Sequence, residues 1–150
     1  MGYVTSYREL EVYKHARRLA QEIFETTKSF PSEEKYSLTD QVRRSSRSIG
    51  AQIAESWAKR KYPKHFISKL TDADGEQHET QHWIDTALDC KYISEQKAVY
   101  LKKEYDLLGK RLGSMMEKSA VFCKNSSTEK KPNKIVSRKF AGELEMVGNN

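Results

Sequence analysis

Residues 37–62, SLTDQVRRSSRSIGAQIAESWAKRKY, constrain the fold of this chain more than any other stretch. Their apolar members recur three, four or seven positions apart, which is the spacing of one face of an α-helix. These apolar residues are Leu38, Val42, Ile49, Ile53 and Trp57. Ser37 and Asp40 have the spacing of an N-terminal helix cap, and Pro63 marks the end. The stretch therefore predicts a long helix with one buried face.

Four small residues lie outside this apolar face: Gly50, Ala51, Ala54 and Ala58. A helix with a single buried face needs no small residues on its other sides, so we expect a second packing contact here. Small side chains let another backbone approach closely. We therefore predict that these four residues form an interface between copies of the chain, which would make the protein a homo-oligomer.

Two further helices flank this one in the sequence. Residues 6–29 combine a capping box, Ser6 with Glu9, with an apolar stripe, and Pro31 stops the helix. Residues 63–92 begin with Pro63, which suits the first turn of a helix because its missing N–H is no loss there. Gly75 interrupts this second pattern, and because an interior glycine weakens a helix, we expect close helix contact at that position.

The fourth predicted helix starts at Ser94 and has the most regular apolar pattern of the chain. Its apolar side alternates spacings of three and four without a break, which is the periodicity of a bundle seam. It comprises Ala98, Leu101, Tyr105, Leu108, Leu112, Met115, Ser119 and Phe122. Four helices of roughly 25 residues with short loops favour antiparallel neighbours. We therefore predict an all-α, antiparallel up-down-up-down four-helix bundle.

The composition changes at the C-terminal end of the chain. From residue 124 onward Ser, Lys, Pro and Asn dominate, and such a segment cannot bury enough surface to order itself. We predict two parts, a four-helix bundle over residues 1–123 and a flexible, basic, polar C-terminal tail over residues 124–150.

Charge and cysteine content restrict the class of protein. The 150-residue chain has a net charge of +6 and a pI near 9.2, and a modest excess of this kind permits an anionic partner without requiring one. Its two cysteines follow no metal-ligand spacing, and no apolar run reaches about 18 residues. We therefore expect a soluble, cytoplasmic protein with reduced cysteines and no membrane partner.

Basic residues gather on the helix of residues 37–62 and in the loop after it, and we interpret them as a nucleic-acid-binding surface. The candidates are Arg43, Arg44, Arg47, Lys59, Arg60, Lys61 and Lys64. At 100° per residue, Arg43, Arg47 and Lys61 share one flank of this helix within about 40°. Tyr62 and His65 add rings on which bases could stack.

Residues 78–82 match H-E-x-x-H, the helix signature of zinc metalloproteases. In a zinc hydrolase His78 and His82 would be ligands and Glu79 the general base. Both histidines, however, project about 150° away from the apolar side of their helix, and a catalytic zinc needs a third protein ligand. Asp85 extends the same exposed stripe and builds no cleft. We therefore keep His78, His82 and Asp85 as weak metal-ligand candidates and predict no cofactor.

Several stretches together resemble one known family. They are FPSEEKYSLTDQVRRSSRSI at residues 30–49, IGAQIAES at residues 49–56, Gly75 followed by Glu79, and KYI at residues 91–93. With these, residues 7–119 resemble the four-helix-bundle proteins found in intervening sequences of bacterial 23S ribosomal RNA genes, the S23 family. This family usually has Ala at the position of Ser45 or Ser46, Asn at Gln52 and Gly at Ser56, and this chain departs from it at each.

The resemblance implies a bacterial helical bundle that forms a homo-oligomer, a pentamer where the assembly of family members is known. A similar fold occurs in accessory proteins of diversity-generating retroelements, which bind nucleic acid and a reverse transcriptase. RNA, DNA, a reverse transcriptase or another nucleic-acid enzyme are therefore the implied partners. The family has no established activity, so the resemblance implies no reaction.

The residues and the resemblance favour a non-enzymatic, oligomeric accessory protein that binds RNA or DNA, or a nucleic-acid enzyme, through a basic surface. Two alternatives stay open from the sequence. One is a structural or protein-interaction oligomer without nucleic-acid binding, in which the basic residues form a solvated face and Asp40 neutralises a neighbouring arginine. The other is the zinc hydrolase.

Overall fold

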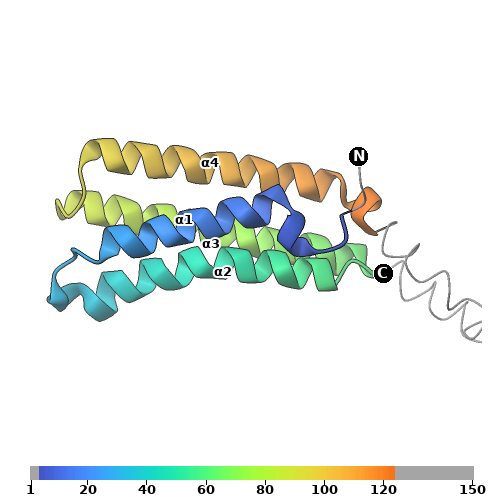
Figure 1. Cartoon of the computed structure of the whole chain (residues 1–150), viewed down its shortest axis with the longest axis horizontal. Helices are drawn as coiled ribbons and strands as arrows, with labels where there is room; N and C mark the ends of the chain where they lie inside the picture. Colours follow the sequence, from blue (N-terminus) through green and yellow to red (C-terminus); the bar gives the residue numbers. More distant parts are fainter. Residues whose placement is uncertain (1–3, 124–150) are drawn as a thin grey trace, which may run out of the picture.

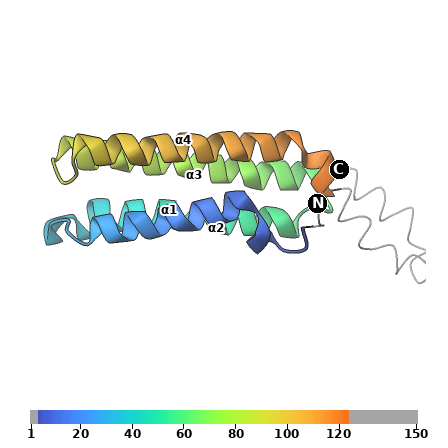
Figure 2. The same cartoon turned by 45° about the horizontal axis from the view of Figure 1, so that its top comes forward.

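Four α-helices, each antiparallel to the next, form a bundle in the computed structural model, which describes residues 4–123 (Figure 1). They are α1 (Glu11–Thr27), α2 (Asp40–Ala58), α3 (Pro63–Asp89) and α4 (Glu95–Glu117). Figure 2 shows α1 beside α2 in one layer and α3 beside α4 in the other. The described residues contain no strand, so the predicted all-α up-down-up-down bundle is confirmed. The predicted tail, residues 124–150, lies outside the described residues.

The predicted apolar stripes supply the core of the bundle. Its fully buried side chains include Leu19, Ile49, Ile53, Phe66, Leu70, Leu101, Tyr105, Leu108 and Leu112. Burial of one large apolar side chain contributes about 1.5–3 kcal/mol. Toward one end of the bundle Phe122 packs on Phe66 and Trp57, with ring centres 5.8 and 6.5 Å apart. No helix of the described residues is long and apolar enough to cross a membrane.

Three serines of α2 are buried, and one of them contacts α3. Ser45 Oγ and Thr80 Oγ1 are 2.8 Å apart across this contact, and both residues are fully buried. Ser46 and Ser56 donate to the carbonyls of Arg43 and Ile53 of their own helix. Because each hydroxyl is satisfied, serine can stand where the resembled family has alanine or glycine.

The first helix starts later than predicted. Ser6 Oγ accepts the N–H of Arg8 and caps only the 3₁₀ turn η1 (Tyr7–Glu9). The Glu9 carboxylate accepts from the N–H and the hydroxyl of Thr5, so it does not complete a capping box with Ser6. The α-helical hydrogen-bond pattern begins at Glu11, and the predicted box therefore organises the turn before the helix.

Both predicted ends of the second helix were also wrong. The chain passes through the 3₁₀ turn η2 (Ser32–Glu34) and the π-helical turn η3 (Lys35–Thr39) before α2 begins. Ser37 does not cap α2 because it lies inside η3, where its hydroxyl donates to the Glu34 carboxylate (2.9 Å). The residue that precedes α2 is Thr39, whose side chain makes no cap hydrogen bond. At the other end α2 stops at Ala58, before Tyr62, and Arg60 Nε donates to the carbonyl of Trp57 (2.9 Å). A side-chain donor thus satisfies a carbonyl of the last turn.

Gly75 does not mark a close helix contact within the chain. Within residues 4–123, and apart from the neighbouring backbone of α3 itself, no atom lies within 4 Å of the position that a Cβ at Gly75 would occupy. The close approach occurs at Gly109 of α4, where a Cβ would lie 2.9 Å from Gln77 Nε2 of α3. The glycine that α3 and α4 need for packing is therefore on α4.

Candidate nucleic-acid interface

The α1–α2 face carries three cationic side chains around one aromatic ring. Arg43, Arg47 and Lys28 place their charged ends 4.7, 5.5 and 5.0 Å from the centre of the half-buried Phe24 ring. Arg43 Nε also donates to the buried Thr27 Oγ1 (2.7 Å). Within residues 4–123, no carboxylate forms an ion pair with Arg43 or Arg47. The two arginines therefore leave a positive charge on this face, whereas Lys28 is paired with Glu25 (3.1 Å).

Arg44, which was predicted to act with these two arginines, lies on a different side of α2. Its guanidinium pairs with the Glu79 carboxylate and lies 3.6 Å from that of Glu76, both on α3. Glu79 also accepts from Trp83 Nε1 (3.3 Å). Arg44 is therefore neutralised by α3 and holds two helices together. Among the described residues Asp40 makes no ion pair with any arginine, so it does not neutralise Arg43 or Arg44.

The corner between α2 and α3 is a second basic region. Lys64 is exposed, and Lys59 and Lys61 are half-buried. The ring centres of Tyr62 and His65 lie 5.4 Å apart, and Lys61 Nζ lies 5.8 Å from the Tyr62 ring. The segment 59–64 contains no acidic residue. This corner therefore combines positive charge with aromatic rings, as sites for single-stranded nucleic acid do.

Arg60 does not belong to this surface. Only 9% of the residue is exposed, and its guanidinium carbon lies 3.6 Å from the centre of the Trp57 ring. With Nε bonded to the Trp57 carbonyl, Arg60 is directed into the end of the bundle. We therefore remove it from the predicted nucleic-acid-binding residues and assign it to packing.

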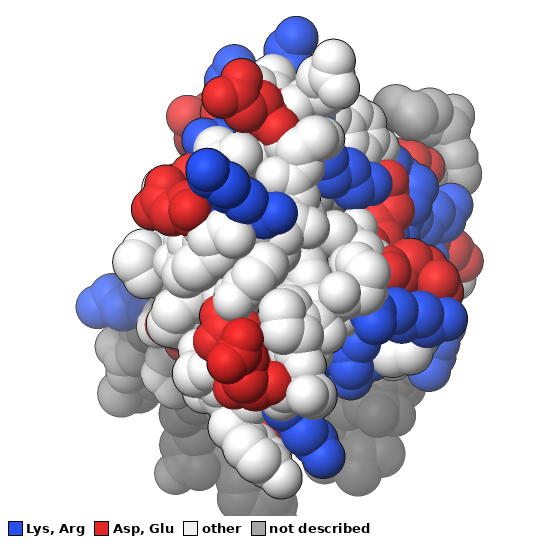
Figure 3. All heavy atoms as spheres, turned by 90° about the vertical axis from the view of Figure 1, so that its left-hand side faces the viewer, with Lys and Arg blue, Asp and Glu red and all other residues white. Residues whose placement is uncertain are grey.

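The two basic regions are separate within one chain. Sixteen residues of rise at 1.5 Å each place Arg43 and Lys59 about 24 Å apart along the helix axis. Lys61 follows the end of α2, so its predicted place on the same flank as Arg43 and Arg47 does not hold. Seen from the end that carries the α1–α2 and α3–α4 connections, acidic and basic side chains are intermixed around an uncharged centre (Figure 3). The positive surface is therefore not continuous around that end.

One of the four residues predicted for an oligomer interface is not on the surface. Gly50 is buried within its own bundle, because a Cβ there would lie 3.7 Å from the ring of Tyr13 on α1. Its small size serves the α1–α2 contact and not a second subunit. Ala51 and Ala58 are exposed and Ala54 is half-buried, so these three alanines remain available on the surface of α2.

His78, Glu79 and Asp85 are engaged in contacts that do not involve a metal site. His78 exposes 69% of its side chain, and its Nδ1 lies 2.9 Å from the carbonyl of Asp74. Asp85 accepts from Lys102 Nζ (2.9 Å), and Glu79 holds Arg44. No group of three His, Cys, Asp or Glu side chains in the described residues is placed to hold a metal ion. The geometry thus does not support His78, His82 and Asp85 as a metal site.

The comparisons with known proteins agree with this fold. Residues 8–114 match the family model of the 23S rRNA-intervening sequence protein. The chain belongs to this family. It is also similar to a protein of unknown function from the S23 ribosomal protein family of Bacteroides thetaiotaomicron, whose crystal structure superposes with a TM-score of 0.63. The two are 26% identical, over 71% of this chain and 95% of that one. No curated protein matches the chain.

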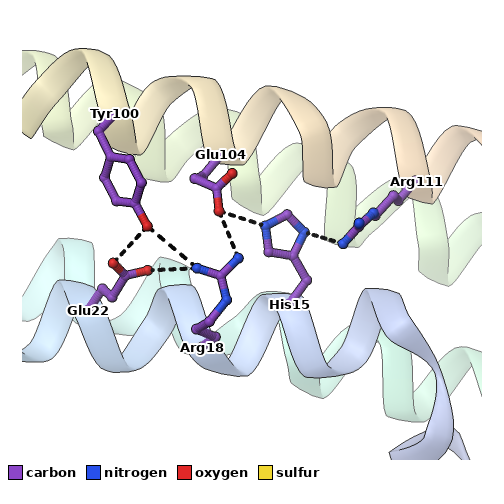
Figure 4. A network of polar contacts seen from close by, with 6 residues as sticks. All are labelled: His15, Arg18, Glu22, Tyr100, Glu104 and Arg111. Atoms are coloured by element: carbon purple, nitrogen blue, oxygen red, sulfur yellow. Dashed lines mark hydrogen bonds and ion pairs between the residues drawn. The ribbon is translucent and has the colours of Figure 1, made fainter.

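A polar network joins α1 to α4 in this intervening-sequence protein (Figure 4). Arg18 donates to Glu104 (2.7 Å) and to Glu22 (3.2 Å), and Tyr100 donates to the other oxygen of Glu22 (3.0 Å). The hydrogen bond from Arg18 lowers the pKa of Glu104, and the bond to Glu22 raises the pKa of Tyr100. The network therefore joins two carboxylates and one arginine across the α1–α4 seam.

His15 occupies the buried side of this network. It is 3% exposed; its Nδ1 lies 3.1 Å from Arg111 Nη1 and its Nε2 3.5 Å from Glu104 Oε1. Burial lowers the pKa of His15, and the nearby Arg111 and Arg18 lower it further. Because arginine can only donate, Nδ1 accepts and the proton of the neutral ring sits on Nε2, toward Glu104. His15 is therefore a neutral bridge, closed to any substrate.

Sequence reasoning missed three residues that shape these sites: His15, Phe24 and Thr27. Phe24 and Thr27 lie near the end of α1, and both contact Arg43 of α2. The burial of His15 could have been predicted from the sequence, because it lies three residues after Val12 and four before Leu19, on the apolar face of α1. A polar residue at such a position needs a partner, and α4 supplies two.

Proposed function

We propose that this intervening-sequence protein is a non-enzymatic, self-associating helical module that binds RNA or DNA through its basic side chains. The observation that carries the proposal is the contrast between neighbouring arginines of α2. Arg44 is neutralised by Glu76 and Glu79, whereas Arg43 and Arg47 have no acidic partner within residues 4–123. Arginine without a carboxylate, on a folded surface, is suited to phosphate.

The second basic region supports the same ligand class. Lys59, Lys61 and Lys64 would contact phosphates, and the Tyr62–His65 pair offers rings for unpaired bases. Neither region presents a row of groups suited to reading base edges, so recognition would depend on the phosphate backbone with little sequence selectivity. Nucleic acid bound this way could be presented to a polymerase or a reverse transcriptase, which would make the protein an accessory to such an enzyme.

Self-association would let these separated regions act together. Ala51, Ala54 and Ala58 leave a surface of α2 on which a second copy could pack closely, and a cyclic assembly such as a pentamer repeats each basic region once per subunit. Weak contacts that repeat in one particle bind jointly. Ala54→Glu should place an unpaired charge in this contact and dissociate the assembly. Light scattering that finds the wild type monomeric at micromolar concentration would end this part of the proposal.

Fluorescence anisotropy with labelled single-stranded RNA and duplex DNA at two salt concentrations tests the binding itself. Affinity should fall with salt by a log–log slope of about 0.7 per phosphate contacted on single strands and about 0.9 on duplex. The double variant Arg43→Glu and Arg47→Glu should weaken binding to unrelated sequences alike and leave the oligomer intact.

A charge-matched control separates a local effect from a change in net charge. Lys103 and Lys110 are exposed on α4, away from α2, so Lys103→Glu with Lys110→Glu changes the net charge equally. The lysine double variant should lower the affinity for nucleic acid much less than the arginine double variant does. If the wild type does not bind at low salt, the nucleic-acid proposal is wrong. If the arginine double variant dissociates the oligomer instead, these arginines belong to a subunit contact and the protein is a structural oligomer.

A further inference from the structure

Arg43 differs from the other basic residues of the two regions because its guanidinium is fixed at two points. Its Nε donates to Thr27 Oγ1 (2.7 Å), and its guanidinium carbon lies 4.7 Å from the centre of the Phe24 ring. Thr27 is 3% exposed, and its own hydroxyl proton is directed to the carbonyl of Ile23 or Phe24 at 2.8 or 3.0 Å. A lone pair of Thr27 Oγ1 therefore faces Arg43.

Fixing Nε leaves the terminal end of the guanidinium available. Within residues 4–123, neither Nη atom of Arg43 makes a hydrogen bond. The two Nη groups of arginine can hold two oxygens of one phosphate as a fork, a geometry that lysine cannot offer. A side chain already held in place loses less conformational entropy on binding than a mobile one.

A second guanidinium lies beside the first. Arg47 places its guanidinium carbon 5.5 Å from the centre of the same Phe24 ring, one helical turn after Arg43. Glu25, the acidic residue at this end of α1, is engaged with Lys28 at 3.1 Å. The pair of arginines thus presents two positive groups next to each other without a carboxylate between them.

From this geometry we propose that Arg43, oriented by Thr27 and Phe24 and assisted by Arg47, is a preformed clamp for one phosphate group of the nucleic-acid backbone. The inference rests on the proposed function and deepens it, because it replaces diffuse attraction with one oriented contact on the α1–α2 face. Thr27 and Phe24 act as positioning residues and do not touch the ligand themselves. The corner of residues 59–64 then adds charge without a fixed geometry.

Variants with an unchanged net charge distinguish an oriented phosphate clamp from diffuse electrostatic attraction. Arg43→Lys retains the positive charge but loses the fork and the bond to Thr27, so affinity for a labelled 20-nucleotide single-stranded RNA should fall about tenfold, the effect of one charge-assisted hydrogen bond. The matched control is Arg44→Lys on the same helix, which should bind within about twofold of the wild type because Arg44 already has carboxylate partners. Thr27→Val removes only the acceptor for Nε and should lower affinity about threefold, with an unchanged circular dichroism spectrum.

The possible results distinguish failure of the clamp from failure of the proposed function. If Arg43→Lys binds as the wild type does while Arg43→Glu with Arg47→Glu binds poorly, attraction is diffuse; the clamp is wrong and nucleic-acid binding stands. If Arg44→Lys weakens binding as much as Arg43→Lys, the clamp is also wrong.

A second measurement does not depend on a polymer ligand or on the stability of Thr27→Val. Titration of the wild type with inorganic phosphate, followed by NMR of the arginine Nε–H signals, should shift the Arg43 signal, which Arg43→Lys identifies by its absence. Chloride at equal ionic strength should leave that signal in place. If the wild type binds no nucleic acid but phosphate shifts the Arg43 signal, Arg43 binds an anion and the proposed nucleic-acid function is wrong. If phosphate and chloride act alike, the clamp is wrong.

Discussion

Replacing Tyr105 by phenylalanine should stabilise the protein, although it removes a polar group from the centre of the bundle. Tyr105 of α4 is fully buried, and its hydroxyl has no hydrogen-bond partner within residues 4–123. Burial raises the pKa of this phenol far above its ordinary value, with Glu22 adding to the effect. A hydroxyl taken from water without a partner costs about 1–3 kcal/mol.

Tyr105→Phe removes this cost and leaves a small void in exchange. The lost oxygen, on the order of 15 Å³, costs only about 0.4 kcal/mol at ~24 cal/mol per Å³ of cavity. The unfolding free energy should therefore rise by about 1 kcal/mol, with a melting temperature about 3 °C higher. Urea unfolding followed by circular dichroism at one fixed protein concentration measures the change. The m value, the slope of the unfolding free energy against urea concentration, should stay the same.

Tyr100→Phe on the same helix is the matched control with the opposite sign. The Tyr100 hydroxyl donates to Glu22 (3.0 Å) and the residue is 41% exposed. Loss of this bond should lower the unfolding free energy by about 0.5–1.5 kcal/mol. If Tyr105→Phe destabilises the protein as Tyr100→Phe does, the Tyr105 hydroxyl has a partner and the reasoning from burial is refuted.

Two further changes test packing and charge. Gly75→Ala should raise the unfolding free energy by about 1 kcal/mol in thermal unfolding, since a Cβ there meets no other part of residues 4–123 within 4 Å. A loss of stability would indicate that a second copy of the chain packs on Gly75. The pKa of His15 lies below its ordinary 6.5, so the unfolded chain takes up this proton first and stability should fall as pH drops below about 6.5. His15→Gln should reduce that loss between pH 6.5 and 5, and an identical pH profile for both proteins would contradict the assignment.

The helices could be predicted from the sequence because helical periodicity reports burial directly. Every predicted position of the fourth helix from Ala98 to Met115 is buried, and so is most of the stripe of residues 38–53. The helix ends could not be predicted, because short-range partners compete for the same atoms. Ser37 has the right spacing to cap α2, yet it lies inside the π-helical turn η3, so its backbone does not stand at the start of α2.

The candidate interface was predicted only in part because ion pairs form between residues far apart in the sequence. Arg43 and Arg44 are adjacent, but a turn of about 100° directs them to different neighbouring helices. Arg44 meets Glu79, 35 residues later in the chain, whereas Arg43 meets Thr27 and Phe24. Sequence spacing could identify the arginines, but the packing of α1 and α3 on α2 decides which of them is paired with a carboxylate.

The same packing explains why a net charge of +6 is a poor guide to function in this bundle. Arg18 is as basic as Arg47, but the α1–α4 seam surrounds it with Glu22 and Glu104 and uses it to join two helices. Arg47 lies on a face where α1 offers an aromatic ring, and the acid at this end of α1, Glu25, is paired with Lys28. The capacity to bind an anion thus depends on which arginines the helix contacts leave without a carboxylate, and on how firmly those contacts hold them.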